Sequence, residues 1–375
     1  MLTLLLLIAA LCLILLAIFF WWLFGGKKSP EALVLGRVAQ NPVLGPVASS
    51  WWESQAVFNP AAIVDGGRVH LFYRALGADG ISRIGYASSA DGINFDRRLP
   101  YPVYAAESAG EAKAHRPFTS PARLTYDTVS YASGGGWGGC EDPRAVKIDG
   151  RVYLTFNMFN GWNCMRVAYT SIDKDNFSAS QWLWERFAYL SRTGDRQKNW
   201  ILFPEKINGK FALFHNLDKG DPARVHIAYL DALDASEAPA PEEAPDPQQL
   251  PDHHVAWHHR TRSASAPPIK TPRGWLLLYH ASEPKEPHIG YKLGALLLDL
   301  DDPTKVLYRS HNPILEPKEW YENDWKPGVI YASGAVVFGD DLIVYYGGGD
   351  KYIAAAKTNL AEFLQKLISQ ENKVY

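Results

Sequence analysis

The sequence predicts an all-β protein, a five-bladed β-propeller with an N-terminal transmembrane helix. A short strand pair recurs five times along the chain, and an uncharged apolar stretch opens it. In the first copy, residues 59–63 and 67–74 form the two strands, with Gly67 at the turn between them. Recurrence of one such unit indicates a repeat architecture, in which each copy packs against its neighbours.

The four later copies repeat the order of strand, turn and strand, and the fifth copy is the weakest match. Their strand pairs begin at residues 142, 203, 268 and 333. A third strand follows in every copy. Equivalent prolines lie more than 60 residues apart, whereas a usual blade has about 40 to 50 residues, so we expect loop insertions. Five units of three or four strands favour a five-bladed propeller over a large β-sandwich.

The opening stretch is long enough to cross a membrane. Residues 1–24 carry no charged side chain, and about 20 apolar residues span a bilayer. Trp21 and Trp22 would lie at the membrane interface. We therefore expect a transmembrane anchor at residues 1–24 that contacts lipid through residues 2–24. A long signal peptide is the alternative.

The rest of the chain follows this stretch. We expect residues 25–50 to form a linker and lead-in, and residues 51–375 to form the catalytic propeller. No Lys or Arg precedes the apolar stretch, so the positive-inside rule favours a cytoplasmic position for a single-pass membrane protein. Residues 360–368 have the apolar spacing of a helix, which we expect to pack against the propeller.

Composition excludes some classes of function. A formal net charge of -2 argues against a nucleic-acid-binding protein, which is usually basic. His253, His254, His258 and His259 have no acidic or cysteine partner at a known spacing, so we predict no metal site. The sequence gives no sign of an organic cofactor and leaves the oligomeric state open.

Cysteines are too few to predict a disulfide framework. Outside the apolar stretch the chain has Cys140 and Cys164 alone, whereas proteins held by disulfides are usually rich in cysteine. A single bridge between these two residues remains open.

Polar side chains recur at one position of the repeat. Arg74, Asn157, His215 and His280 each follow the aromatic end of the second strand in their copy. Because ligands of such folds usually bind in a concave site near the centre, a ring of polar groups at equivalent places indicates a binding site. Simple exposure at a strand end is the alternative.

The second copy carries an acidic motif before its first strand. Glu141 and Asp142 stand there, with Arg144 two residues further on. An arginine beside a carboxylate lowers the carboxyl pKa, whereas a general acid needs a raised pKa, so burial or a bound anion would have to dominate. A structural Asp142–Arg144 pair is the alternative.

These residues together resemble glycoside hydrolase family 130, which holds β-mannoside phosphorylases and related β-mannosidases on a five-bladed propeller. The resemblance covers roughly residues 51–357. It is carried by the motifs at 139–144 (Gly-Cys-Glu-Asp-Pro-Arg), 202–207 (Leu-Phe-Pro-Glu-Lys-Ile) and 268–280, and by Asn59-Pro60-Ala61 with Tyr73-Arg74-Ala75. The three later motifs in combination are specific to this family.

The resemblance implies that Asp142 is the proton donor, acting through a substrate hydroxyl, while inorganic phosphate attacks the anomeric carbon with inversion. It implies phosphate binding by Arg166, Lys270 and His280, since cationic groups donate charge-assisted hydrogen bonds to phosphate. Inverting hydrolysis would instead need a second carboxylate to activate water, and Glu205 is the candidate base. The remaining substrate-binding candidates are Asn59, Arg74, Glu141, Arg144, Asn157 and His215.

One departure from the family pattern leaves the acceptor open. Family phosphorylases commonly carry an arginine after the histidine of the third copy, whereas this chain has His215-Asn216. Lys198 is a possible replacement. We therefore predict a glycosidase or glycoside phosphorylase, in the hydrolase or glycosyltransferase class. It would act on β-mannosides with inversion, with no cofactor, and with inorganic phosphate as co-substrate if it is a phosphorylase. A non-catalytic, membrane-tethered glycan-binding propeller is the alternative.

Overall fold

The computed structural model describes most of the chain from Leu33 onward. The described residues are Leu16, 33–105, 136–160, 165–194, 197–217, 225–234, Ser236, Trp257, 260–285 and 288–369. Residues 34–375 belong to one compact unit. Within it, the described strands form five antiparallel groups in chain order, and each group corresponds to one copy of the predicted repeat.

The first group contains β2 (Ala56–Asp65), β3 (Arg68–Leu76), β4 (Ile81–Ser89) and β5 (Arg97–Arg98). The second contains β6 (Gly138–Ile148), β7 (Arg151–Phe159), β8 (Met165–Asp173) and β9 (Ala188–Tyr189). The third contains β10 (Ile201–Leu202), β11 (Phe211–Leu217) and β12 (Val225–Leu230). The fourth contains β13 (Arg260–Ala264), β14 (Ile269–Thr271), β15 (Gly274–Lys285), β16 (His288–Leu298) and β17 (Val306–Arg309). The fifth contains β18 (Ile330–Phe338), β19 (Asp341–Gly348), β20 (Tyr352–Asn359) and the early β1 (Gly36–Arg37).

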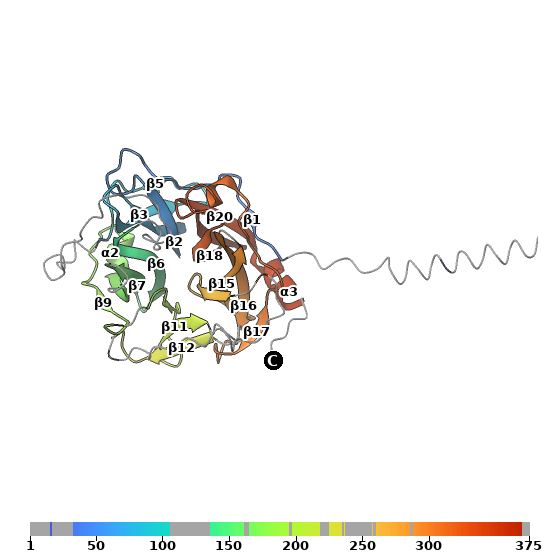
Figure 1. The fold of residues 1–375 in the computed structure, drawn as a ribbon. Coiled ribbons are helices and arrows are strands. Elements are labelled where there is room, and N and C mark those ends of the chain that lie inside the picture. The colour runs from blue at the N-terminus through green and yellow to red at the C-terminus, as the bar shows by residue number, and fades with distance from the viewer. Residues whose placement is uncertain are drawn as a thin grey trace, which may run out of the picture. The chain divides into compact units, whose positions relative to one another are not determined.

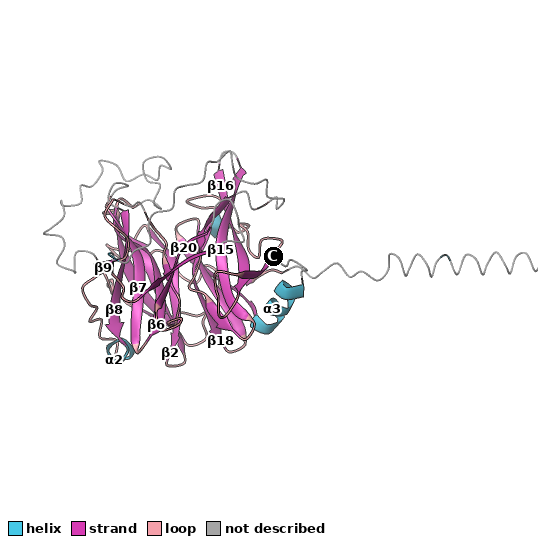
Figure 2. Ribbon diagram, turned by 90° about the horizontal axis from the view of Figure 1, so that it is seen from below, coloured by secondary structure: helices cyan, strands magenta, loops and turns pink. Residues whose placement is uncertain are grey.

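The groups follow one another around a common centre, and the fifth group lies beside the first (Figure 1). Three short helical elements accompany the described strands: α2 (Lys174–Ser178), the 3-10 turn η6 (Trp320–Glu322) and α3 (Leu360–Ser369). Helix α3 confirms the helix expected at residues 360–368, and it lies at the outer side of the strands in Figure 2. Its buried side chains are Phe363, Leu364 and Leu367.

The predicted five-bladed propeller needs one correction, because the described strands form four sheets. Strands β4 and β6 pair in parallel, Ile81 with Gly138 and Ser82 with Gly139, and this pairing joins the first two groups into one sheet. Gly139 makes the approach possible. Its φ is 103°, and a Cβ at this position would lie 2.1 Å from the carbonyl oxygen of Ser82.

The predicted membrane helix also has to be corrected. No helix in the described part of the chain is long and apolar enough to span a bilayer. The expected anchor at residues 2–24 lies outside the described residues, apart from Leu16. The assignments to a single-pass membrane protein, to lipid contacts and to a membrane location therefore have no support, and we withdraw them. The expected lead-in at residues 25–50 contains β1, which pairs with β20 through Arg37 and Ala356.

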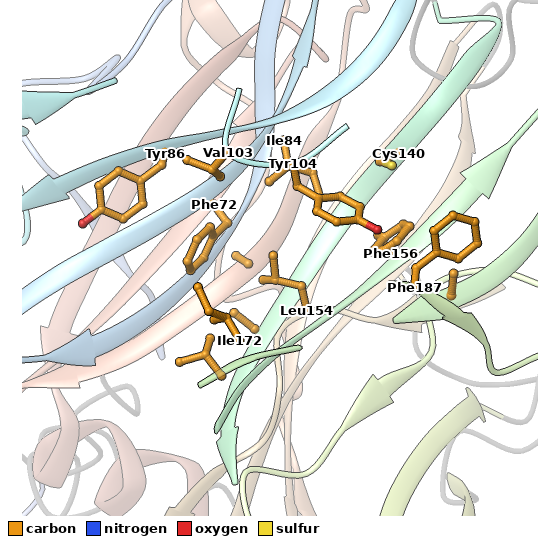
Figure 3. Close-up of a cluster of buried hydrophobic side chains, with 14 of the residues drawn as sticks. Phe72, Ile84, Tyr86, Val103, Tyr104, Cys140, Leu154, Phe156, Ile172 and Phe187 are labelled. Carbon is orange, nitrogen blue, oxygen red and sulfur yellow. The ribbon is translucent and has the colours of Figure 1, made fainter. Parts of the chain in front are cut away.

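An apolar cluster fills the space between the first two groups (Figure 3). Phe72 and Tyr86 come from β3 and β4, and Leu154 and Phe156 come from β7. All four side chains are almost fully buried. Burial of apolar surface is the main stabilising contribution to folding, so this cluster fixes β6 against the first group. Cys140 belongs to the same cluster, and Cys164 lies outside the described residues.

Register breaks in the strands create the polar centre of the molecule. In β2 the pairing with β3 shifts between Phe58 and Ala61, and in β6 the pairing with β7 shifts between Glu141 and Arg144. A β-bulge re-aims the side chain of the extra residue. The bulges place Asn59 and Asp142 in the left-handed region, with φ of 48° and 50°. Asn and Asp tolerate this conformation better than other non-glycine residues.

Candidate active site

Asp142 lies where the bulges of the first two groups meet. The Nδ2 group of Asn59 donates a hydrogen bond of 2.6 Å to Oδ1 of Asp142. On the other side, Nδ2 of Asn157 donates to Oδ2 over 3.4 Å. Asn157 is held in turn by Asn199, whose backbone N–H donates to its Oδ1 at 2.8 Å. The structure thus brings two of the predicted site residues, Asn59 and Asn157, to the carboxylate of a third, Asp142.

Arg74 bridges the two carboxylates of the acidic motif. Its Nη2 group lies 2.8 Å from Oε1 of Glu141, and its Nη1 group lies 3.3 Å from Oδ1 of Asp142. The Nε group donates to Oγ of Ser82 at 2.9 Å. The side chains of Arg74 and Glu141 are almost completely buried. Because a buried charge needs a partner, Arg74 and the acidic motif depend on one another.

Arg144 supports the backbone of Asp142 rather than its carboxylate. Its Nη1 group donates to the carbonyl oxygen of Asp142 at 2.7 Å, and its Nε group donates to the carbonyl oxygen of Ser265 at 2.6 Å. Its Nη2 group donates to Oη of Tyr331 at 3.3 Å. The side chain therefore ties the left-handed turn at Asp142 to the fourth and fifth groups.

The pKa of Asp142 reflects opposing influences. Burial is the largest single influence and raises the pKa, but the charges of Arg74, Lys198 and Arg144 and the hydrogen bond from Asn59 lower it by more in sum. The net pKa lies below the ordinary value of an aspartate. In this state of the site, Asp142 is therefore an ionised carboxylate at neutral pH.

A small pocket opens over Asp142, and its lining residues come from the first, second, fourth and fifth groups and the segments that connect them. It is lined by Phe58, Asn59, Arg74, Asp142, Lys198, Tyr291, Lys326, Val329, Tyr331 and Asp350. Three of its lining side chains are cationic: Arg74, Lys198 and Lys326. Oδ1 of Asn59 is buried and has no hydrogen-bond partner among the described residues. A polar pocket of this kind suits a hydroxyl-rich ligand or an anion.

Sequence reasoning missed Lys326 and Asp350, which form an ion pair of 3.1 Å in this pocket. Asp350 follows β19 at the end of the run Gly347-Gly348-Gly349 and has a φ of 53°. In the sequence, the three glycines before Asp350 at a strand end were the available signal that this aspartate belongs to a site. Lys326 comes from the loop before β18, where the sequence carries no comparable signal.

His280 packs against Tyr331, which lines the pocket, and is a neutral histidine. Burial lowers its pKa to about 3, and the charge of Arg144 acts in the same direction against that of Asp142. The backbone N–H of Ala332 donates to Nε2 at 2.9 Å, so the ring proton is on Nδ1. Nδ1 has no hydrogen-bond partner among the described residues. The ring stacks on Tyr331 with centroids 4.2 Å apart.

Two further candidates have other surroundings. Arg166 donates from Nε and Nη2 to the carbonyl oxygen of Ser191, and its guanidinium lies 3.6 Å from the centre of the Tyr189 ring. The ring of His215 lies 5.9 Å from that of Trp200. Neither Arg166 nor His215 is among the residues that line the pocket over Asp142.

The structure places Glu205 and Lys270 together, but not at Asp142. Their side chains form an ion pair of 2.5 Å, and both are about half exposed. Lys270 pairs with Trp275 near the turn of the β14–β15 hairpin. Trp275 lies five residues before His280 along β15. At about 3.3 Å per residue this separation is roughly 16 Å along the strand. The pair therefore belongs to the turn end of the fourth group.

Comparison with known proteins identifies the family. A family model described as β-1,4-mannooligosaccharide phosphorylase matches residues 128–368. The chain is 36% identical to the 1,2-β-oligomannan phosphorylase of Thermoanaerobacter sp. (strain X514) over 336 residues. This aligned region covers 86% of this chain and 96% of the relative. The chain is 34% identical, with the same coverage, to a β-1,2-mannobiose phosphorylase of that organism.

Solved structures show the same fold. The β-1,2-mannobiose phosphorylase of Listeria innocua, in complex with β-1,2-mannobiose, superposes with a TM-score of 0.63 at 23% identity, over 89% of this chain and 99% of that one. The names of the relatives support a glycoside phosphorylase and give no support to the broader glycosyltransferase label or to a membrane protein. On the family match and the identity to these relatives, the chain belongs to glycoside hydrolase family 130.

Proposed function

We propose that this glycoside-cleaving enzyme, which acts on β-mannosides, transfers a mannosyl unit to inorganic phosphate with Asp142 as the proton donor. The observation that carries the proposal is the pocket in which the buried Asp142 faces three cationic side chains. Phosphate oxygen attacks the anomeric carbon, the glycosidic bond breaks, and the departing oxygen takes the proton of Asp142. The products are mannose 1-phosphate and the shortened saccharide.

Because the cations hold the pKa of Asp142 low, a bound phosphate that offsets their charge can trigger protonation of Asp142. Arg74 and Lys198 lower its pKa. A phosphate bound beside them offsets their charge, so the pKa of Asp142 rises and the carboxyl takes up a proton. The acid is then ready only when the co-substrate is present. Asn59 supports the sugar in this scheme, because its unpartnered Oδ1 can accept a hydrogen bond from a hydroxyl.

Hydrolysis is the second candidate, and the observation that favours it is the carboxylate of Asp350 in the pocket lining. An inverting hydrolase needs a second carboxylate to activate water. Glu205 does not line the pocket, whereas Asp350 does. Its Oδ2 atom is paired with Nζ of Lys326, so this oxygen is already occupied by a cation rather than open to a water. For this reason we rank phosphorolysis first.

The linkage follows from the relatives. Two curated relatives that cover nearly all of their own length are named for 1,2-β-linked mannosides. We therefore propose a β-1,2-linked substrate and place β-1,4-linked mannosides second.

The decisive experiment incubates the protein with β-1,2- or β-1,4-mannobiose, each with and without phosphate. We expect mannose 1-phosphate from the β-1,2-linked sugar, and only when phosphate is present. Mannose formed at an equal rate without phosphate would establish hydrolysis instead. Absence of either product from both sugars would overturn the proposed function.

Asp142→Asn tests the role of the acid. Asparagine tolerates the left-handed backbone at this bulge, as Asn59 does at the matching bulge of the first group. The fold should therefore persist, while kcat falls by about 10²- to 10⁴-fold, the usual contribution of a general acid. Turnover with an unchanged kcat would remove Asp142 from the mechanism, and the melting temperature serves as the control for folding.

A further inference from the structure

We propose that Trp320, Asp324, Lys351 and Tyr352 form a second sugar-binding subsite, which holds a mannosyl unit of a longer chain outside the pocket. This inference rests on the proposed function and extends it from a disaccharide to oligosaccharides. It concerns a surface beside the pocket that takes no part in bond cleavage.

Trp320 is an exposed aromatic side chain in a fixed position. It is 60% exposed. Its ring meets Tyr321 and Tyr352 edge to face, with centroids 5.7 Å and 5.2 Å away. Tyr321 is buried, so this contact anchors the indole to the core. A rigid aromatic side chain binds the C–H surface of a sugar at low entropic cost.

Polar groups lie beside this aromatic ring. Oδ2 of Asp324 accepts hydrogen bonds from Nζ of Lys351 at 2.8 Å and from Oη of Tyr352 at 3.0 Å. Asp324 and Lys351 are both partly exposed. Acceptor, donor and aromatic ring together match the two kinds of surface that a pyranose presents, its hydroxyl groups and its C–H bonds.

The surface is continuous with the pocket through two chain segments. Lys326 and Asp350 line the pocket. Asp324 lies two residues before Lys326, and Tyr352 lies two residues after Asp350, a reach of at most about 7 Å in each case. The backbone N–H of Lys326 donates to the carbonyl oxygen of Gly349 at 3.0 Å, which holds the two segments together. A saccharide that leaves the pocket along these segments meets Trp320 next.

The test compares Trp320→Ala with the parent protein on β-1,2-mannobiose and on β-1,2-mannotetraose, both with saturating phosphate. We expect KM for the tetrasaccharide to rise about 5- to 10-fold, as the loss of an aromatic contact predicts. The KM for the disaccharide and both kcat values should stay within twofold. Tyr352→Phe, which keeps the ring and removes the bond to Asp324, should give a smaller rise. Leu183→Ala is the matched control, because Leu183 is 65% exposed and lies outside this surface.

The outcomes separate this inference from the proposed function. Equal changes for both sugars, or no change for either, would overturn the subsite while phosphorolysis of the disaccharide remains established. Loss of a dimer in Trp320→Ala on size-exclusion chromatography would identify the surface as a contact between two copies and would also overturn it. A parent protein that is inactive on the disaccharide refutes the proposed function itself.

Discussion

Asp142 is held by neighbours that keep it charged, yet its proposed task is to give up a proton. The motif Glu141-Asp142-Pro143-Arg144 already raised this conflict, since an arginine two residues away favours the ionised form. In the structure, the arginine that contacts the carboxylate of Asp142 is not the one in the motif. Arg74, from the first group, contacts the carboxylate, whereas Arg144 contacts the backbone. Distances between groups on separate strand pairs cannot be obtained from spacing along the chain.

The proposed protonation of Asp142 by bound phosphate makes a prediction about the pH dependence of activity. In the free enzyme its pKa lies below the ordinary aspartate value, so kcat/KM measured for sugar at low phosphate should decline as pH rises through the acidic range. With saturating phosphate, kcat should keep its value to a higher pH, because the bound anion raises the pKa of Asp142. Identical profiles at low and saturating phosphate would contradict the scheme.

His280 predicts an acid-sensitive stability. Burial lowers its pKa to about 3 in the folded protein, against about 6.5 in an unfolded chain. Between these values the unfolded chain binds more protons, so the free energy of unfolding falls as pH drops from about 6.5 towards 3. Thermal melts of His280→Gln should therefore show a shallower loss of melting temperature between pH 6.5 and 4.5. Equal slopes for variant and parent would show that His280 does not carry this dependence.

At the scale of single elements, the short strand β1 helps to hold the loop that follows η6, which lies far from it in the sequence. Arg37 donates from Nε and Nη2 to the wholly buried carboxylate of Glu322, at 2.8 Å and 2.9 Å. Glu322 ends η6, and its carbonyl oxygen accepts from the N–H of Val329, which lines the pocket. The N-terminal strand therefore helps to hold the loop that carries Lys326.

Arg37→Met tests this connection. The variant leaves Glu322 buried without its cation, which should lower the free energy of unfolding by about 3 kcal/mol. Because the loop carries Lys326 and Val329, KM for the sugar should rise as well. The matched control is Arg98→Met, since Arg98 is similarly exposed and pairs at 2.7 Å with another buried carboxylate, Glu53. Neither of these residues lines the pocket. A similar rise in KM for both variants would assign the effect to general destabilisation.

At the scale of the whole molecule, the parallel pairing of β4 with β6 makes one sheet of the first two groups. Recurrence of the strand pair could predict the groups but not this junction, because the chain between the two copies is long. The junction positions Arg74 of one group against Glu141 of the next. The active site therefore depends on a contact between two repeats rather than on either repeat alone.

Gly139→Ala tests how much the molecule depends on this junction. A side chain there meets the backbone of Ser82 and has to adopt a φ of 103°, and backbone strain of this kind costs roughly 1–3 kcal/mol before any clash is added. Gly150→Ala is the control, because Gly150 also has a positive φ but nothing lies within 4 Å of its added Cβ. We expect Gly139→Ala to lose clearly more stability in denaturant unfolding. Equal losses would show that the junction tolerates a side chain.

The β-rich repeat, the family and the identity of the proposed acid could be predicted from the sequence, because turn residues, strand periodicity and the Glu-Asp-Pro-Arg motif are local in the chain. The sequence also led to the expectation of a membrane anchor at residues 1–24, which no helix in the described part of the chain supports, since an apolar stretch of the right length satisfies the same rule whether or not it spans a bilayer. Only the tertiary structure gathered Arg74, Lys326 and Asp350 around Asp142 and kept Glu205 and Lys270 apart from it. The reason is physical: electrostatic effects depend on distance and burial in space, and these are decided by how separate strand groups pack.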